Sequence, residues 1–287
     1  MSTEPGPAGQ FVRGIREQDI PYRATFYTVV LLFLTSTLVP FGLVFLISIS
    51  QPGAYFEGWV GIPSNITFEN WINGFNSLKD NLINSFLIAA GVTVISMVVT
   101  IPSAYAFGRK EFPGRKVLFY TIIIAMMFPY ILLVLPIADV WIQMGLYNTL
   151  PGLWIAYQVF VTPFAIWILR DYFQKLPRNI EEAAMVYGCT EVSAFYRVIL
   201  PLATPAIVAV GFLAFLTGWN DFLFSNFLTL GGGPIPAVVE LYQLVNSGSG
   251  EKVRWGALMA QVFIVGLPPT ALYIMARRYL TDAFAFE

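Results

Sequence analysis

The sequence predicts an all-α polytopic membrane protein with six transmembrane helices, and three observations carry this prediction. Of the 287 residues, 57% are hydrophobic and only 11% are charged, against about 25% charged residues in a soluble domain. Six apolar segments have about the length of roughly 20 residues that crosses a hydrocarbon core. The lysines and arginines are distributed unevenly between the two sides that these segments define.

A continuous apolar segment that crosses lipid has to satisfy its own backbone hydrogen bonds, so each segment is expected to be helical. A membrane barrel would instead need short segments of alternating polarity, which these continuous runs are not. The predicted spans, in chain order, are Phe26–Ser48, Leu82–Phe107, Val117–Ala138, Leu153–Leu169, Ala203–Leu223 and Gly256–Ala276.

The orientation follows from the basic residues. With the N-terminus in the cytoplasm, all of the 16 lysines and arginines fall in cytoplasmic segments except Lys79, Lys252 and Arg254. Cytoplasmic loops of membrane proteins carry an excess of such residues. We therefore expect a multi-pass protein of the inner or plasma membrane of a prokaryote, with both termini in the cytoplasm.

The expected organisation is a single transmembrane domain with two polar ends. Residues 1–25 are polar and rich in glycine and proline, and we expect a flexible cytoplasmic arm there. Residues 26–280 form the transmembrane domain, with a long cytoplasmic loop at about 171–201. Residues 281–287 form a short cytoplasmic tail.

Composition and missing motifs exclude several classes of function. The chain has no histidine and one cysteine, Cys189, so we expect no catalytic residues, no metal site and no bound cofactor. There is no phosphate-binding glycine motif of the P-loop or dinucleotide type, so any ATP or magnesium belongs to a partner. A net charge of −1 argues against nucleic acid as a partner, and membrane lipid is the expected surrounding.

The loop at 171–201 has the pattern of a short helix, a sharp turn and a second helix. Ile180, Ala183, Ala184 and Tyr187 recur at helical spacing and form one stripe. Gly188 is placed to end the first helix in a left-handed turn. Thr190 is placed to cap the second helix. The residues leave two interpretations open, an amphipathic connector that rests on lipid or on its own bundle, and a docking site for another protein.

The same segment carries a specific resemblance. Glu182-Ala183-Ala184 is followed after three residues by Gly188 and, after nine more, by the run 198–201, Val-Ile-Leu-Pro. This resembles the E-A-A motif of ATP-binding-cassette (ABC) importer permeases, with valine at the first position of the family's I-x-L-P. Stretches 104–116, 127–137, 145–153 and 218–224 resemble the carbohydrate branch, typified by the maltose permease subunit MalG. The resemblance covers roughly residues 25–280.

The resemblance implies a fold, partners and a site. The fold is the type I, MetI-like permease architecture. The partners are a second homologous permease, an ATPase dimer and an extracytoplasmic substrate-binding protein. The loop helix is the coupling helix, seated on one ATPase, and its coupling residues are Glu182, Ala183, Ala184, Tyr187 and Gly188.

Polar residues in the spans are the candidates for a substrate path. Asp221 is the one charge placed within a predicted span, and Trp219 and Asn220 precede it directly. A carboxylate in lipid is costly, so it should face the bundle interior or water. Aromatic rings stack on sugars, and amides and carboxylates bind hydroxyl groups. Asn84 is a weaker candidate, and interfacial anchoring and helix packing are the alternatives for this group.

The resulting hypothesis is a non-enzymatic permease subunit of an ABC importer for a sugar, an oligosaccharide or a related polyol or glycoside. It would form half of the translocation path. The alternative is a stand-alone secondary transporter or channel, which would usually carry more charged groups in its spans and could show an inverted repeat. A membrane enzyme is disfavoured because the spans lack paired catalytic groups.

Overall fold

The computed structural model describes residues 7–51, 65–246 and 255–284, with side chains described from residue 24 to residue 279 within these ranges. The chain divides into two compact units. The first contains the residues up to Trp71 together with Arg254–Ala260, and the second contains Ile72–Val253 and Gln261–Glu287. Across the described ranges the structure is helical, and the β pairing it contains is one isolated bridge, Ser50 with Ile66.

The first unit is built on helix α1, Pro7–Ser48. Residues 7–25, where the sequence predicts a flexible arm, are therefore helical, and residues 1–6 lie outside the described part. Within residues 24–48 of α1, an 18-residue stretch has a mean hydropathy of 2.5. The end of α1 is held by Asn70, whose Nδ2 donates to the carbonyl oxygens of Ser48 at 3.1 Å and Ser50 at 2.7 Å.

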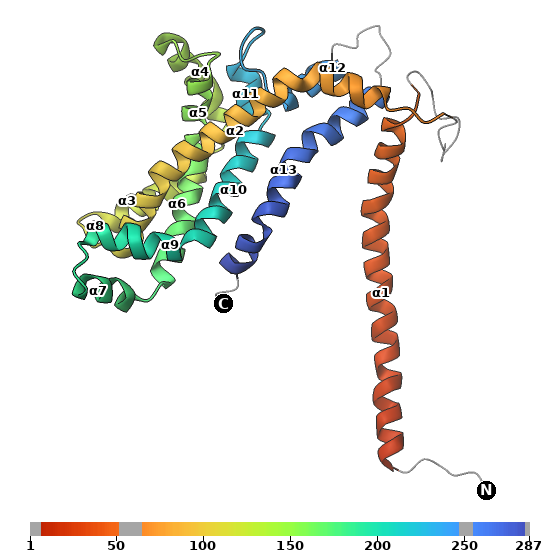
Figure 1. Ribbon diagram of the computed structural model, residues 1–287, viewed down its shortest axis with the longest axis horizontal. Helices are drawn as coiled ribbons and strands as arrows, with labels where there is room; N and C mark the ends of the chain where they lie inside the picture. The colour runs from red at the N-terminus through yellow and green to blue at the C-terminus, as the bar shows by residue number, and fades with distance from the viewer. Residues whose placement is uncertain (1–6, 52–64, 247–254, 285–287) are drawn as a thin grey trace. The chain divides into compact units, whose positions relative to one another are not determined.

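The second unit contains the remaining helices (Figure 1). The long ones are α2 (Glu69–Arg109, whose first residues belong to the first unit) and α13 (Trp255–Phe284, which likewise starts there). Between them in the chain lie α3 (Arg115–Met126), α4 (Ile131–Met144), α5 (Leu150–Ala156), α6 (Gln158–Lys175), α7 (Arg178–Val186), α8 (Glu191–Ala194), the π-helical turn η1 (Phe195–Ile199), α9 (Leu200–Leu202), α10 (Thr204–Asn220), α11 (Leu223–Leu228) and α12 (Ala237–Asn246).

The predicted spans are recovered, but three of them are bent. In the described residues three helices are long and apolar enough to cross a membrane, and there are up to six spans when each bent helix pair is taken as one. The bends are 100° between α3 and α4, 45° between α5 and α6, and 74° between the α8–α9 segment and α10. The third predicted span, Val117–Ala138, thus consists of two helices that meet near Pro129.

Proline chemistry explains two of these bends. Pro129 follows Phe128, where the α3 ladder has already tightened to a bond from the Phe128 N–H to the Ala125 carbonyl. A proline restricts the residue before it and cannot donate the next helical bond, so a new helix starts at Ile131. Pro201 likewise removes a helical donor. The turn before it widens into η1, and the chain bends at Ala203.

Helix lengths also exceed the apolar segments. α2 begins at Glu69 rather than near Leu82, and α13 continues to Phe284 rather than ending near Ala276. The predicted tail at 281–287 is therefore helical up to Phe284, and its last residues lie outside the described part. Hydropathy detects the apolar part of a helix and not its polar extensions, which is why these ends were missed.

The core of the second unit forms where α10 packs against α2, α6 and α13. Gly218 of α10 lies so close to α2 that a Cβ there would be 2.9 Å from the Ala89 Cα. Trp219 is 1% exposed, and its Nε1 donates to the Val265 carbonyl of α13. The C-terminal end of α10 is thus packed between α2 and α13.

Candidate coupling site and substrate path

The loop between α6 and α10 forms the predicted helix, glycine turn and second helix. α7 is closed by a left-handed turn in which Gly188 has φ +91°. The N–H of Cys189 donates to the Ala184 carbonyl at 3.0 Å, and that of Tyr187 donates to the Ala183 carbonyl at 3.0 Å. Thr190 then caps α8 by accepting from the Ser193 N–H at 3.2 Å. The glycine turn and the threonine cap are confirmed.

The turn presents an exposed apolar surface, which we call the loop patch. It consists of Met185, Val186, Tyr187, Val192 and Tyr196, and its exposed fractions reach 86% for Val186 and 89% for Tyr187. Glu182, Ala183 and Gly188 are exposed beside it, and Ala184 is half-buried. Large apolar side chains gathered at such exposure are typical of a surface that binds another molecule.

Glu182, the first residue of the motif, and Glu181, which directly precedes it, have opposite environments. Glu182 is exposed, whereas Glu181 is 8% exposed. Tyr105, from the end of α2, donates its hydroxyl hydrogen bond to Glu181 Oε1. Lys110 Nζ, just beyond the same helix, lies 3.4 Å from Glu181 Oε1 and 3.0 Å from Glu191 Oε2 of α8. A buried carboxylate is tolerated when it is paired and hydrogen-bonded.

The surroundings of Lys110 stabilise its charged form. Burial by itself lowers the pKa of Lys110, but its hydrogen bonds to Glu191 and Tyr105 and the attraction of Glu181 outweigh burial and raise the pKa to about 12. The ammonium group therefore stays charged at neutral pH. The ring of Tyr105 packs against Phe173 and Phe195. The partner of its hydroxyl could not be predicted from the sequence, because no local pattern relates residues so far apart.

The predicted path residues at the end of α10 are engaged within the chain. Asp221 Oδ2 accepts from the Tyr157 hydroxyl at 2.8 Å and from the Phe224 N–H at 2.9 Å, so it holds the start of α11. Trp219 is buried and stacks on Phe215, and its ring offers no face to a ligand in this structure. Asn220 is exposed. Trp219, Asn220 and Asp221 are adjacent in the chain, but they do not form a common exposed surface.

The contact of Asn84 fits the alternative interpretation, in which this side chain serves packing within the protein. Its Nδ2 donates to the Ile235 carbonyl at 3.1 Å, as does that of Asn81. Ser85 accepts from the Ala237 N–H at 2.8 Å. These side chains of α2 therefore hold the segment that leads into α12.

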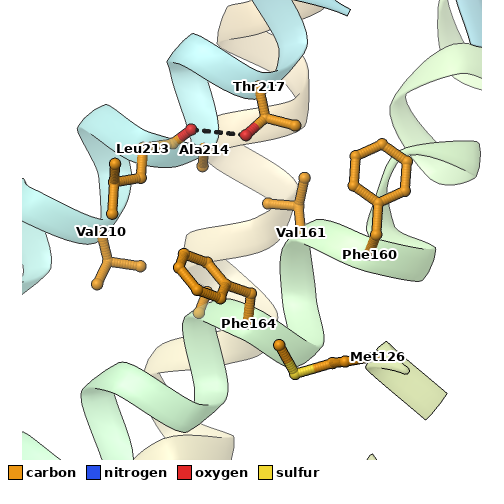
Figure 2. A pocket seen from close by; sticks show the side chains of 9 residues that line it. Met126, Phe160, Val161, Phe164, Val210, Leu213, Ala214 and Thr217 are labelled. Atoms are coloured by element: carbon orange, nitrogen blue, oxygen red, sulfur yellow. Dashed lines mark hydrogen bonds between the residues drawn. The ribbon is translucent and has the colours of Figure 1, made fainter. Parts of the chain in front are cut away.

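One cavity of about 250 Å³ lies among α3, α6 and α10, with Met126 and Phe164 at its wall (Figure 2). Among its described lining residues only Thr217 has a polar side chain, and its hydroxyl donates to the Leu213 carbonyl at 2.8 Å. The sequence reading did not single out this cavity. Its chemistry suits an apolar group rather than a sugar, which needs several hydrogen-bonding partners.

The fold and the loop together define a class, the membrane permeases of transport systems. A family model described as "binding-protein-dependent transport system inner membrane component" matches residues 96–282. The chain belongs to this family and is a multi-pass membrane protein.

Curated relatives agree along most of the chain. The trehalose transport permease SugB of Mycobacterium tuberculosis is 34% identical over 259 residues, covering 89% of this chain and 94% of the relative. The diacetylchitobiose uptake permease NgcG of Streptomyces coelicolor is 27% identical, and the match covers 96% of this chain and 91% of the relative. The trehalose/maltose permease MalG of Thermococcus litoralis is 30% identical, and the match covers 69% of this chain and 71% of the relative.

Solved structures share the fold. A chain from a bacterial ABC transporter involved in alginate import matches with a TM-score of 0.78 at 21% identity, covering 92% of this chain and 98% of that one. A chain of the MetNI methionine ABC transporter matches with a TM-score of 0.54 at 19% identity, covering 70% of this chain and 95% of that one. The predicted all-α, type I importer permease architecture is confirmed.

Proposed function

We propose that this chain is the transmembrane permease subunit of an ABC importer for a sugar or a related glycoside, and that it forms half of the translocation path. The family is one of binding-protein-dependent transport, and several relatives are named for the uptake of trehalose, maltose or diacetylchitobiose. The alternative of a stand-alone transporter or channel has no comparable support.

The loop patch is the observation that carries the coupling role. It leaves Val186 and Tyr187 almost fully exposed at the tip of a helix and glycine turn, with the acidic Glu182 and the small Ala183 beside them. This shape and chemistry suit a helix that inserts into a cleft of another protein. The partner is an ATPase subunit, and Glu182, Ala183, Ala184, Tyr187 and Gly188 are the coupling residues.

The remaining partners follow from the same role. A second homologous permease completes the path, an ATPase dimer supplies ATP and magnesium, and an extracytoplasmic binding protein delivers the substrate. This chain binds no cofactor of its own and performs no catalysis. It lies in the inner membrane of a prokaryote with both termini in the cytoplasm, the orientation favoured by its lysines and arginines.

The proposed path residues of this chain differ in their surroundings. Asn220 is exposed, but Trp219 is buried and both Asp221 and Asn84 have partners in their own chain. A path role for these residues requires that the sister permease or another conformation opens this region.

The substrate class is tested by identifying, with mass spectrometry, the ligand on the binding protein of the purified complex. An amino acid or a metal ion there would contradict the proposed sugar.

The docking role is tested by replacing exposed patch residues. Tyr187→Ser and Val186→Ser should reduce the amount of ATPase that co-purifies with the permease and should lower ATP-driven uptake. Because both side chains are so exposed, their loss should change the stability of the chain itself by less than about 0.5 kcal/mol. Tyr120→Ser, at a residue that is 62% exposed on α3, is the matched control. Undiminished ATPase binding by the patch variants would exclude the loop as the docking site.

A further inference from the structure

Three segments meet at one polar cluster beside the loop patch. Tyr105 and Lys110 come from the end of α2 and the residue after it, Glu181 comes from α7, and Glu191 comes from α8. We call these four residues the Glu181 cluster. In Figure 1 the end of α2 and the helices α7 and α8 lie at the same end of the second unit.

We propose that the Glu181 cluster is the connection through which a movement of α7 is passed to α2, so that Tyr105, Lys110 and Glu181 are positioning residues for coupling. This inference rests on the proposed function, in which an ATPase grips the loop patch. It concerns the side of α7 that faces this chain, whereas the coupling motif concerns the side that faces the partner.

The burial of Glu181 is the first step of the argument. A carboxylate out of water is costly unless it is hydrogen-bonded and paired. Glu181 meets both conditions through Tyr105 and Lys110. Because pulling Glu181 away from these partners would leave it buried and unpaired, or require it to be rehydrated, α7 and the end of α2 should move together.

The second step is that α2 holds α7 at more than one point. Arg109, which is 8% exposed, lies with its Nη2 3.5 Å from the carbonyl oxygen of Pro177, at the start of α7. Lys110 in turn bridges to Glu191 of α8 at 3.0 Å. Both helices of the loop are therefore joined to consecutive residues at one end of α2.

The third step is the length and packing of α2. It is one helix of 41 residues, about 60 Å at 1.5 Å per residue. It runs from the Glu181 cluster past the close contact of Ala89 with Gly218 of α10 to Asn84, which holds the Ile235 carbonyl. α2 contains Pro102 but is still one helix and is not among the bent pairs, and a packed helix moves as a rigid element rather than deforming continuously. A displacement of α7 can thus reach the segment before α12.

The experiment measures substrate imported per ATP hydrolysed, in proteoliposomes that contain the whole importer. Tyr105→Phe removes only the hydroxyl and keeps the ring against Phe195, and Lys110→Met removes the charge that pairs with Glu181. Each should lower this ratio by about tenfold, the factor that corresponds to losing a hydrogen bond to a charged group, while the ATPase still co-purifies. Lys110→Arg should restore most of the ratio.

Matched controls and a double variant separate coupling from general damage. Tyr120→Phe removes the same hydroxyl group as Tyr105→Phe, and Glu111→Gln removes the same carboxylate charge as Glu181→Gln, both at exposed positions, and they should leave the ratio unchanged. Tyr105→Phe combined with Glu181→Gln should lower the ratio no further than the stronger single variant, because both remove one shared interaction.

Two results would overturn the inference. One is an unchanged ratio in Tyr105→Phe and Lys110→Met. The other is a loss of ATPase co-purification in both, which would make the cluster a support of the docking surface rather than a transmitter. Failure of the proposed function is distinct from either, since the unmodified chain would then not assemble with the ATPase.

Discussion

Replacing Gly188 by alanine isolates the cost of the left-handed turn between α7 and α8. A Cβ built at Gly188 meets no atom within 4 Å, so the substitution creates no clash within the chain. The backbone, however, has φ +91°, where a residue with a Cβ is strained by about 1–2 kcal/mol. This strain corresponds to a roughly 5- to 30-fold lower population of the turn relative to unwound alternatives.

The assay is ATP-driven uptake in proteoliposomes, together with the amount of ATPase that co-purifies. If docking requires the preformed turn, Gly188→Ala should lower both by up to that factor. Gly188→Asn should lower them less, because asparagine visits the left-handed region more readily. Gly231→Ala is the control, since Gly231 also has open space around its Cβ position but is not among the residues with positive φ.

A comparison with Gly188→Trp then reports on the partner. The chain itself leaves open space around the Cβ position of residue 188, so a loss beyond that of Gly188→Ala is expected to come from a second protein close to the turn. Activity of Gly188→Ala equal to that of Gly231→Ala would refute the requirement for the left-handed turn. Equal activity of the alanine and tryptophan variants would refute close docking at this position.

Two further predictions concern the close contact of α2 with α10 and the charge of Lys110. Gly218→Ala should destabilise the chain by about 1–3 kcal/mol and lower its thermal unfolding midpoint, because the new Cβ would lie 2.9 Å from the Ala89 Cα. Gly211→Ala on the same helix, with its nearest atom at 3.7 Å, should not, and equal midpoints would contradict the contact. The raised pKa of Lys110, about 12 against an ordinary 10.5, means that its stabilising contribution is complete below pH 10.5 and is lost as the pH rises through 12. The ratio of uptake by the unmodified chain to that by Lys110→Met should therefore be constant between about pH 6 and pH 9, and a drop within that window would show that Lys110 titrates lower.

Much of the fold was predictable because its signals are local. Apolar runs long enough to cross a bilayer predict spans, and glycine after an amphipathic run predicts the left-handed end of α7. Both were confirmed. The bend at Pro129 was harder to predict, because a proline within an apolar run permits either a kinked helix or a break, and neighbouring helices decide between them.

By itself, the sequence determined that the chain is a helical membrane permease with a helix–glycine–helix loop, since hydropathy, charge bias and the E-A-A motif are all properties of short segments. Only the tertiary structure decided which of two adjacent glutamates faces outward. Glu181 is buried because Tyr105 and Lys110, 76 and 71 residues away in the chain, meet it. It likewise decided that Trp219 packs inside the bundle rather than lining a surface. Burial and pairing depend on residues that are distant in the chain, and no local pattern encodes which of them will meet.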